Sequence, residues 1–218
     1  MRVAIAGAGA VGRSIALELV DNNHQVMLIE RELSNIDPES VEAAEWVHAD
    51  ACELASLEEA GLEDCDVVIA ATGDDKVNLV VSLLAKTEFA VRRVVARVND
   101  PRNEWLFDEN WGVDVAVSTP RLLAALVEEA VAVGDLVRLM TLRQGQANLV
   151  EVTLPAHTPL AGAPVHAIKL PVDSALVTIL RGGRVIVPQP DDPLEAGDEL
   201  LFVAAADVEG EIRKALGY

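Results

Sequence analysis

The sequence has few cysteines, and several catalytic motifs are missing from it. Cys52 and Cys65 are the only two cysteines in 218 residues, with no CxxC spacing and no nearby His or Cys set. We therefore expect two reduced, partly buried thiols rather than a disulfide framework or a zinc site. The chain also has no HExxH, GxSxG or P-loop motif. It therefore lacks the sequence signatures of zinc proteases, α/β-hydrolases and P-loop nucleotidases.

Positive charge and long apolar runs are also lacking. Lys and Arg number 17 against 36 Asp and Glu, a formal net charge of −19. Such a chain repels phosphate backbones, so we expect no nucleic-acid partner. The apolar runs fall well short of the ~20 residues of a membrane helix, and a strand-like run begins at Arg2, which leaves no room for a signal peptide. These features predict a soluble, cytoplasmic protein.

The first thirty residues carry the strongest signal. A strand-like run is followed by a GxGxxG pattern, a helical pattern and a second strand that ends in Glu30, 18 residues after Gly12. In this pattern Gly7 permits a tight turn, Gly9 lets the backbone approach a pyrophosphate, and Gly12 allows close packing of helix on strand. The N–H groups at the helix start favour phosphate, and Glu30 can accept hydrogen bonds from ribose hydroxyls. The combination predicts dinucleotide binding.

Strand-like and helical patterns alternate from residue 1 to about 117. The expected strands are Val3–Ala6, Gln25–Glu30, Trp46–Ala49, Asp66–Ala71, Val94–Val98 and Val113–Val117. The expected helices are Val11–Val20, Leu54–Ala60, Lys76–Thr87 and Arg102–Asn110. This alternation predicts an α/β fold, a Rossmann-like doubly wound parallel sheet. Its ligand crevice is expected beyond the carboxyl ends of the strands.

Three further loops at that edge carry candidate ligand contacts. Asp50 and Ala51 follow the third strand, Thr72 and Gly73 follow the fourth, and Arg97 lies near the end of the fifth. Thr72 and Gly73 offer a hydroxyl and bare amides, and Arg97 is expected to point into the crevice.

For two aspartates in these loops, the sequence leaves two roles open. Asp50 and Asp74 each precede a helical pattern. Both positions suit an N-cap as well as a ligand contact.

A different pattern begins at residue 119. Thr119 and Pro120 suit an N-cap and a first helical residue, and the helix 119–133 then shows an apolar stripe at helical spacing. The members of the stripe include Leu122, Leu123, Leu126, Val127 and Val131. By itself, this pattern fits packing within the chain as well as packing on a partner subunit.

The pattern of the segment from residue 135 to residue 218 predicts a small α+β domain. Its expected strands are Val137–Leu142, Asn148–Leu154, Ala175–Leu180, Arg184–Val187 and Glu199–Ala204, with helical stretches at Val165–Leu170 and Val208–Leu216. Gly182 and Gly183 mark a hairpin turn. The expected domains are therefore residues 1–118 for nucleotide binding, 119–134 for a linking helix and 135–218 for the C-terminal domain.

The chain thus has a cofactor site without an evident reaction. His157 and His166 lie in Pro-rich loops, and neither has a carboxylate at a spacing that suggests a proton relay. This favours nucleotide sensing, with no catalytic residue and no metal site expected. The alternative is an NAD-dependent oxidoreductase with a small substrate domain, and fold alone does not decide between them.

The order of motifs closely resembles the RCK (regulator of K⁺ conductance, or KTN) domains of TrkA/KtrA-type proteins. The resemblance rests on the GxGxxG loop, Glu30, the run HADA at 48–51, the run DVVIAATGDD at 66–75 followed by Asn78, and the run VARVNDP at 95–101. The segment from about residue 137, with LEAGDELLFV at 194–203, resembles the RCK C-terminal domain.

The resemblance implies a cytoplasmic regulatory subunit, peripheral on the inner face of the plasma membrane. Such subunits bind a nucleotide and gate a separate membrane potassium-translocating subunit of a Trk/Ktr uptake system. They form homodimers that assemble into rings, here by oligomerisation of a single RCK copy or by pairing with a second RCK polypeptide. The resemblance also implies that the helix 119–133 crosses to the partner subunit.

The motif and the resemblance together give the expected site. The cofactor-binding residues are Gly7, Ala8, Gly9, Ala10, Val11, Gly12, Glu30, Asp50, Ala51, Thr72, Gly73 and Arg97. ATP-responsive members of the family carry a basic residue at the place of Ala10, so the neutral Ala10 favours NAD(H), with ATP or ADP as the other candidates. Glu30 repels a 2′-phosphate, which disfavours NADP.

Overall fold

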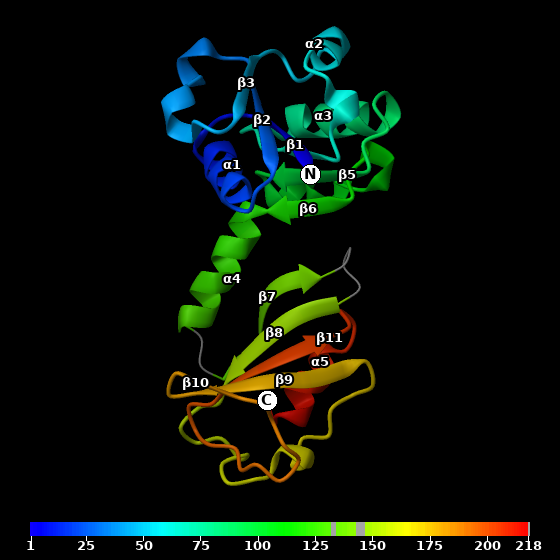
Figure 1. The fold of residues 1–218 in the computed structure, drawn as a ribbon. Helices are drawn as coiled ribbons and strands as arrows, with labels where there is room; N and C mark the ends of the chain where they lie inside the picture. Colours follow the sequence, from blue (N-terminus) through cyan, green and yellow to red (C-terminus); the bar gives the residue numbers. More distant parts are fainter. Residues whose placement is uncertain (132–133, 143–146, 218) are drawn as a thin grey trace. The chain divides into compact units, whose positions relative to one another are not determined.

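A computed structural model describes residues 1–131, 134–142 and 147–217 (Figure 1). The chain divides into two compact units, Met1–Pro120 and Arg121–Tyr218.

The N-terminal unit contains a six-stranded sheet in the order β3-β2-β1-β4-β5-β6. Its strands are β1 (Arg2–Ala6), β2 (Gln25–Glu30), β3 (Glu45–His48), β4 (Val67–Ala70), β5 (Arg93–Val98) and β6 (Val115–Ser118). All neighbouring strands pair in parallel. The predicted doubly wound parallel sheet is therefore confirmed, and the strand order reverses between β1 and β4.

Helices cover both faces of this sheet. Alternate residues of β1 point to opposite faces, so Val3 and Ile5 pack with α1 (Ala10–Asp21), and Ala4 and Ala6 face the cluster of α2 (Leu54–Glu59) and α3 (Asp75–Thr87). β1 and β2 are buried on both faces along most of their length, which explains why their sequences are nearly continuous apolar runs.

Two connections of this unit differ from the expectation. The predicted helix 102–110 is wrong: the segment forms two 3₁₀ turns, η4 (Pro101–Leu106) and η5 (Glu109–Trp111). The side chain of Asp108 accepts from the Asn110 N–H and starts the second turn, and such local side-chain bonds compete with a continuous helix. Between β2 and β3 the chain forms the unpredicted 3₁₀ turns η1 (Leu33–Asn35) and η2 (Pro38–Val41), with the short turn η3 (Leu62–Asp64) before β4.

The C-terminal unit contains a five-stranded antiparallel sheet in the order β10-β9-β11-β8-β7. The strands are β7 (Val137–Leu142), β8 (Ala147–Thr153), β9 (Ser174–Arg181), β10 (Arg184–Ile186) and β11 (Glu199–Ala204). Phe202 of β11 and Ile212 of α5 (Glu209–Ala215) are fully buried in its core. Gly182 and Gly183 both have positive φ and connect β9 to β10, as the predicted hairpin requires. The stretch 165–170 forms only a 3₁₀ turn, η6 (Val165–Ala167).

The helix α4 spans Thr119–Val131. The last two residues of the expected helix, 132 and 133, lie outside the described residues. Four apolar side chains on α4 are largely exposed: Leu123 (63%), Leu126 (56%), Val127 (54%) and Val131 (75%). Within the described ranges, the chain has no helix with the length and apolar character that crossing a membrane requires.

Candidate functional site

A cavity of about 600 Å³ opens at the carboxyl ends of the parallel strands. It is lined by the glycine-rich loop after β1, by residues after β2, β3 and β4, and by Arg97 of β5. The expected residues that line it are Gly7, Gly9, Ala10, Val11, Glu30, Asp50, Ala51, Thr72, Gly73 and Arg97. Ala8 and Gly12 are buried and are not among the lining residues.

The glycines of the loop after β1 differ in what surrounds them. Gly7 has φ +101°, and a Cβ on Gly12 would lie 1.9 Å from the Gly7 carbonyl oxygen. A Cβ on Gly9 would meet nothing within 4 Å. Gly9 is also the N-cap of α1, and no side chain caps that helix start. The space above Gly9 therefore fits a phosphate group, because the helix amides point toward it.

Glu30 joins β2 to the glycine-rich loop. Its Oε2 accepts from the Ala8 N–H at 2.9 Å, and its Oε1 accepts from the Glu32 N–H at 2.9 Å. The residue is only 9% exposed, yet it lines the cavity. A carboxylate has about four acceptor positions, so these two bonds leave capacity for ribose hydroxyls.

Asn78, which is fully buried, forms hydrogen bonds that fix the loop after β4. Its Oδ1 accepts from the N–H and the hydroxyl of Thr72, at 2.9 and 2.6 Å. Its Nδ2 donates to the carbonyls of Thr72 (3.2 Å) and Arg97 (2.8 Å). The Thr72 hydroxyl, expected to face a ligand, is therefore engaged within the loop. Gly73 beside it has open space, since nothing lies within 4 Å of a Cβ built there.

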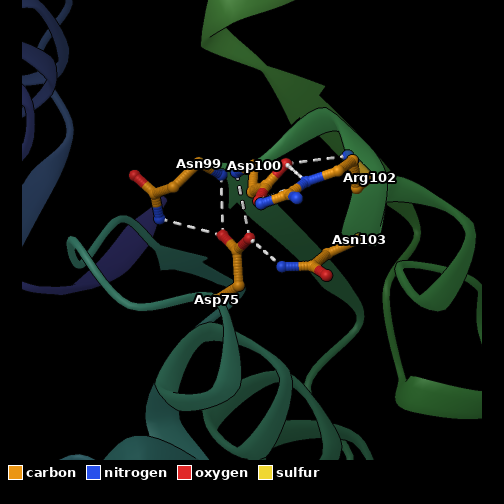
Figure 2. A network of polar contacts seen from close by, with 5 residues as sticks. All are labelled: Asp75, Asn99, Asp100, Arg102 and Asn103. Atoms are coloured by element: carbon orange, nitrogen blue, oxygen red, sulfur yellow. Dashed lines mark hydrogen bonds and ion pairs between the residues drawn. The ribbon is translucent and has the colours of Figure 1, made fainter.

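A second polar network supports the end of β5 (Figure 2). Asp75, 8% exposed, accepts four hydrogen bonds through its two carboxylate oxygens. Oδ1 accepts from the N–H and Nδ2 of Asn99, at 2.7 and 3.0 Å. Oδ2 accepts from the Asp100 N–H at 3.0 Å and from Asn103 Nδ2 at 2.8 Å. The chain just after β5 is thereby tied to the first turn of α3.

The charges in this network are stabilised by hydrogen bonds. Burial raises the pKa of Asp75, but the hydrogen bonds from Asn103, Asn99 and Asp100 outweigh it, and the net pKa lies below the ordinary value. Asp100 is paired with the Arg102 guanidinium at 2.6 Å. The side-chain hydrogen bond from Arg102 lowers the pKa of Asp100 to about 2.

Arg97 places a cation at the β5 end of the cavity. Its side chain is half-buried, and in the described part of the chain its Nε is buried without a hydrogen-bond partner. Buried donors nearly always have partners. The unpaired Nε therefore fits an acceptor group supplied by a ligand.

The two aspartates with open roles behave differently. Asp74 is the N-cap of α3, where it accepts from the Lys76 N–H at 2.8 Å, and it also lines the cavity. The capping role is wrong for Asp50, because the N-cap of α2 is Glu53. Asp50 instead accepts from the Cys52 N–H at 2.9 Å and faces Arg31 across 3.8 Å.

Several residues of the cavity wall were not predicted from the sequence. These are Ile29, Arg31, Glu32, Asn35 and Val77. Arg31 and Glu32 directly follow Glu30, so their position beyond β2 was a usable signal. Asn35 belongs to the turn η1, and its place in the cavity wall depends on how that turn directs the chain after β2.

A parallel sheet in this strand order, with a glycine-rich cavity at its switch point, defines a dinucleotide-binding domain of the Rossmann type. The TrkA-N domain matches residues 3–119 and the TrkA-C domain matches residues 149–217, so the chain belongs to the TrkA family.

Relatives and solved structures agree with this family. The chain is 66% identical over 216 residues to the Trk system potassium uptake protein TrkA of Mycobacterium tuberculosis H37Rv, covering 99% of this chain and 98% of the relative. It is 30% identical to a TrkA homolog of Methanothermobacter thermautotrophicus, covering 97% of both.

Among solved structures, a GsuK channel bound to NAD covers all of this chain and 39% of its own, with 17% identity and a TM-score of 0.72. Identity this low shows the fold alone. GsuK bound to ADP matches 59% of this chain and 34% of its own, with 27% identity and a TM-score of 0.51.

Proposed function

We propose that this chain is a cytoplasmic, nucleotide-sensing regulatory subunit of a Trk-type potassium uptake system, and that NAD(H) is its ligand. The observation that carries the proposal is the cavity at the strand ends, in a chain similar over its whole length to a protein named for Trk potassium uptake. The named relatives give no support to the oxidoreductase alternative.

In the proposed complex the pyrophosphate lies over Gly9, Ala10 and Val11, at the start of α1. The bare backbone permits close approach, and the helix N-terminus stabilises the negative charge. Glu30 accepts hydrogen bonds from the adenosine ribose through its remaining lone pairs. Ala8 and Gly12 do not line the cavity but support its wall. The Ala8 amide orients Glu30, and Gly12 lets α1 pack on the loop.

The extent of the cavity favours a dinucleotide. Its walls come from residues at the ends of β1, β2, β3, β4 and β5, and five adjacent strands about 4.8 Å apart span roughly 19 Å. Asp50 and Ala51 lie on the adenosine side, while Thr72, Gly73 and Arg97 lie on the other side of the switch point. The unpaired Arg97 Nε is then satisfied by the second nucleoside. ATP or ADP would fill the adenosine side of the cavity and leave the Arg97 side to water.

The exposed apolar side chains of α4 provide the proposed contact between subunits. A helix that leaves four large apolar residues at least half exposed is typical of a helix with a partner. We assign it to a homodimer in which α4 packs on the second copy. Such dimers assemble into a ring, alone or with a second RCK polypeptide, beneath a membrane potassium-translocating subunit.

Regulation then requires that the nucleotide distinguishes two states of this assembly. A ligand with equal affinity for both states shifts nothing, however tightly it binds. The cavity wall combines segments from several strand ends, so relative movement of these segments changes the affinity and couples occupancy to the ring.

Calorimetric titration tests the ligand assignment. NADH, NAD, ATP and ADP are titrated into the full chain and into a Gly9→Val variant, with Gly210→Ala as a control at another glycine with open space. We expect NADH or NAD to bind most tightly, and the Gly9 variant to lose binding. Equal affinities in the wild type and the Gly9 variant would reject this site.

A further inference from the structure

The adenosine side of the cavity carries two opposing specificity signals. Glu30, at the end of β2, suits the free 2′-hydroxyl of NAD. Arg31, the next residue, lines the same cavity, and an arginine near this place is what accommodates the 2′-phosphate of NADP. The sequence alone therefore contains both the acceptor for a hydroxyl and the donor for a phosphate.

The Arg31 side chain is 63% exposed, and it is paired with two carboxylates. Its Nε donates to Glu32 Oε1 at 3.1 Å, its Nη2 lies 3.1 Å from the same oxygen, and its Nη1 lies 3.8 Å from Asp50 Oδ2. Both carboxylates line the cavity. The backbone beneath is fixed as well, because His48 Nε2 donates to the Arg31 carbonyl at 2.9 Å and the Glu32 N–H donates to Glu30.

The local charge follows from these residues. Glu30, Glu32 and Asp50 bring three negative charges to this end of the cavity, against the single positive charge of Arg31. A 2′-phosphate would add about two more negative charges beside them. It would also have to compete with two carboxylates for the guanidinium.

We propose that Glu32 and Asp50 determine the cofactor specificity of this site by withholding Arg31 from a 2′-phosphate. Arg31 is thus a latent phosphate-binding residue, and its carboxylate partners keep the site selective for ligands with a free 2′-hydroxyl. This inference rests on the proposed nucleotide function of the cavity.

The test measures the affinities of NADH and NADPH for four proteins. These are the wild type, the double variant Glu32→Gln/Asp50→Asn, the same variant with Arg31→Ala added, and the control Glu39→Gln/Glu42→Gln. The amide variants keep an oxygen acceptor for the Cys52 N–H and for Arg31 but remove two charges. The control removes two charges from exposed positions that do not line the cavity.

We expect the wild type to bind NADH at least about tenfold more tightly than NADPH. In the double variant, the ratio of the NADPH dissociation constant to the NADH dissociation constant falls by about tenfold or more. Adding Arg31→Ala restores this ratio, and the control variant keeps it near the wild-type value. If NADH binds normally but the double variant narrows the ratio no more than the control does, the inference is wrong and the proposed function stands. If the wild type binds neither dinucleotide, both are wrong.

Discussion

The Glu30 carboxylate accepts a hydrogen bond from the Ala8 N–H at 2.9 Å, and this contact joins the end of β2 to the glycine-rich loop. One acidic side chain thus has two roles, since it faces the cavity and also orients the backbone that is proposed to hold the pyrophosphate. Loss of the carboxylate therefore affects the apo protein as well as the complex.

Replacement of Glu30 by Ala is expected to lower stability as well as affinity. The Ala8 amide is buried and loses its acceptor, which costs about 1–3 kcal/mol in free energy of unfolding. Urea denaturation of the apo protein measures this, with Glu42→Ala as the control at an exposed position. A wild-type unfolding midpoint for the Glu30 variant would show that the contact to Ala8 contributes nothing.

The glycine-rich loop offers a pair of substitutions with opposite expected outcomes. Gly9→Ala leaves stability unchanged and weakens nucleotide binding, because φ is −67° and the new Cβ projects into open space where the phosphate is proposed to lie. Gly12→Ala destabilises the fold, because its Cβ would lie 1.9 Å from the Gly7 carbonyl oxygen. Thermal unfolding and titration of both variants check this. An unstable Gly9→Ala with normal affinity would contradict the assignment.

The Asp75 network predicts a pH dependence of stability. The folded-state pKa of Asp75 is lowered by its hydrogen bonds, so the unfolded state binds the proton more readily, and the stabilisation is present above the unfolded pKa. It is lost as the pH falls from about 4 through the lower folded pKa. Asp75→Asn is therefore less stable than the wild type at pH 7, and the difference shrinks toward pH 3. Denaturation at both pH values measures it, and a constant difference would exclude this carboxylate as the cause.

The apolar side chains of α4 predict an oligomer. If they pack on a second copy, each fully buried Leu contributes about 1.5–3 kcal/mol, and Leu126→Glu gives monomers or insoluble protein because it carries an unpaired charge into the contact. Leu17→Glu, at an exposed leucine on α1, is the matched control and stays dimeric. Size exclusion with light scattering decides it. A wild-type monomer at micromolar concentration would contradict the dimer and the ring derived from it.

The fold was largely predictable because its strongest patterns are local. The short apolar runs and the GxGxxG loop marked the strands and the start of α1, and the Gly182–Gly183 turn marked a hairpin. The helix expected at 102–110 failed because aspartate side chains bind nearby amides there, which periodicity does not detect.

The positions of the cavity-lining residues were easier to predict from the sequence than the contacts between their side chains. The glycine-rich motif and the strand ends placed Gly9, Glu30 and Arg97 at the carboxyl edge of the sheet, and all three line the cavity. The contact of Asn78 with Arg97 and the pairing of Arg31 with Asp50 join segments that are separate in the sequence, and sequence spacing does not encode such contacts.

Potassium uptake tests the central claim most directly. The wild-type chain and the Gly9→Val variant are each expressed in a strain from which the gene for this chain has been deleted. The strain retains the membrane translocation subunit from the organism that encodes this chain. Potassium uptake is then measured at limiting external potassium. We predict that the wild type restores uptake and that the Gly9 variant, present at the same level, does not respond to nucleotide and fails to restore it. Full restoration by the Gly9 variant, or none by the wild type, would contradict a regulator that acts through this cavity.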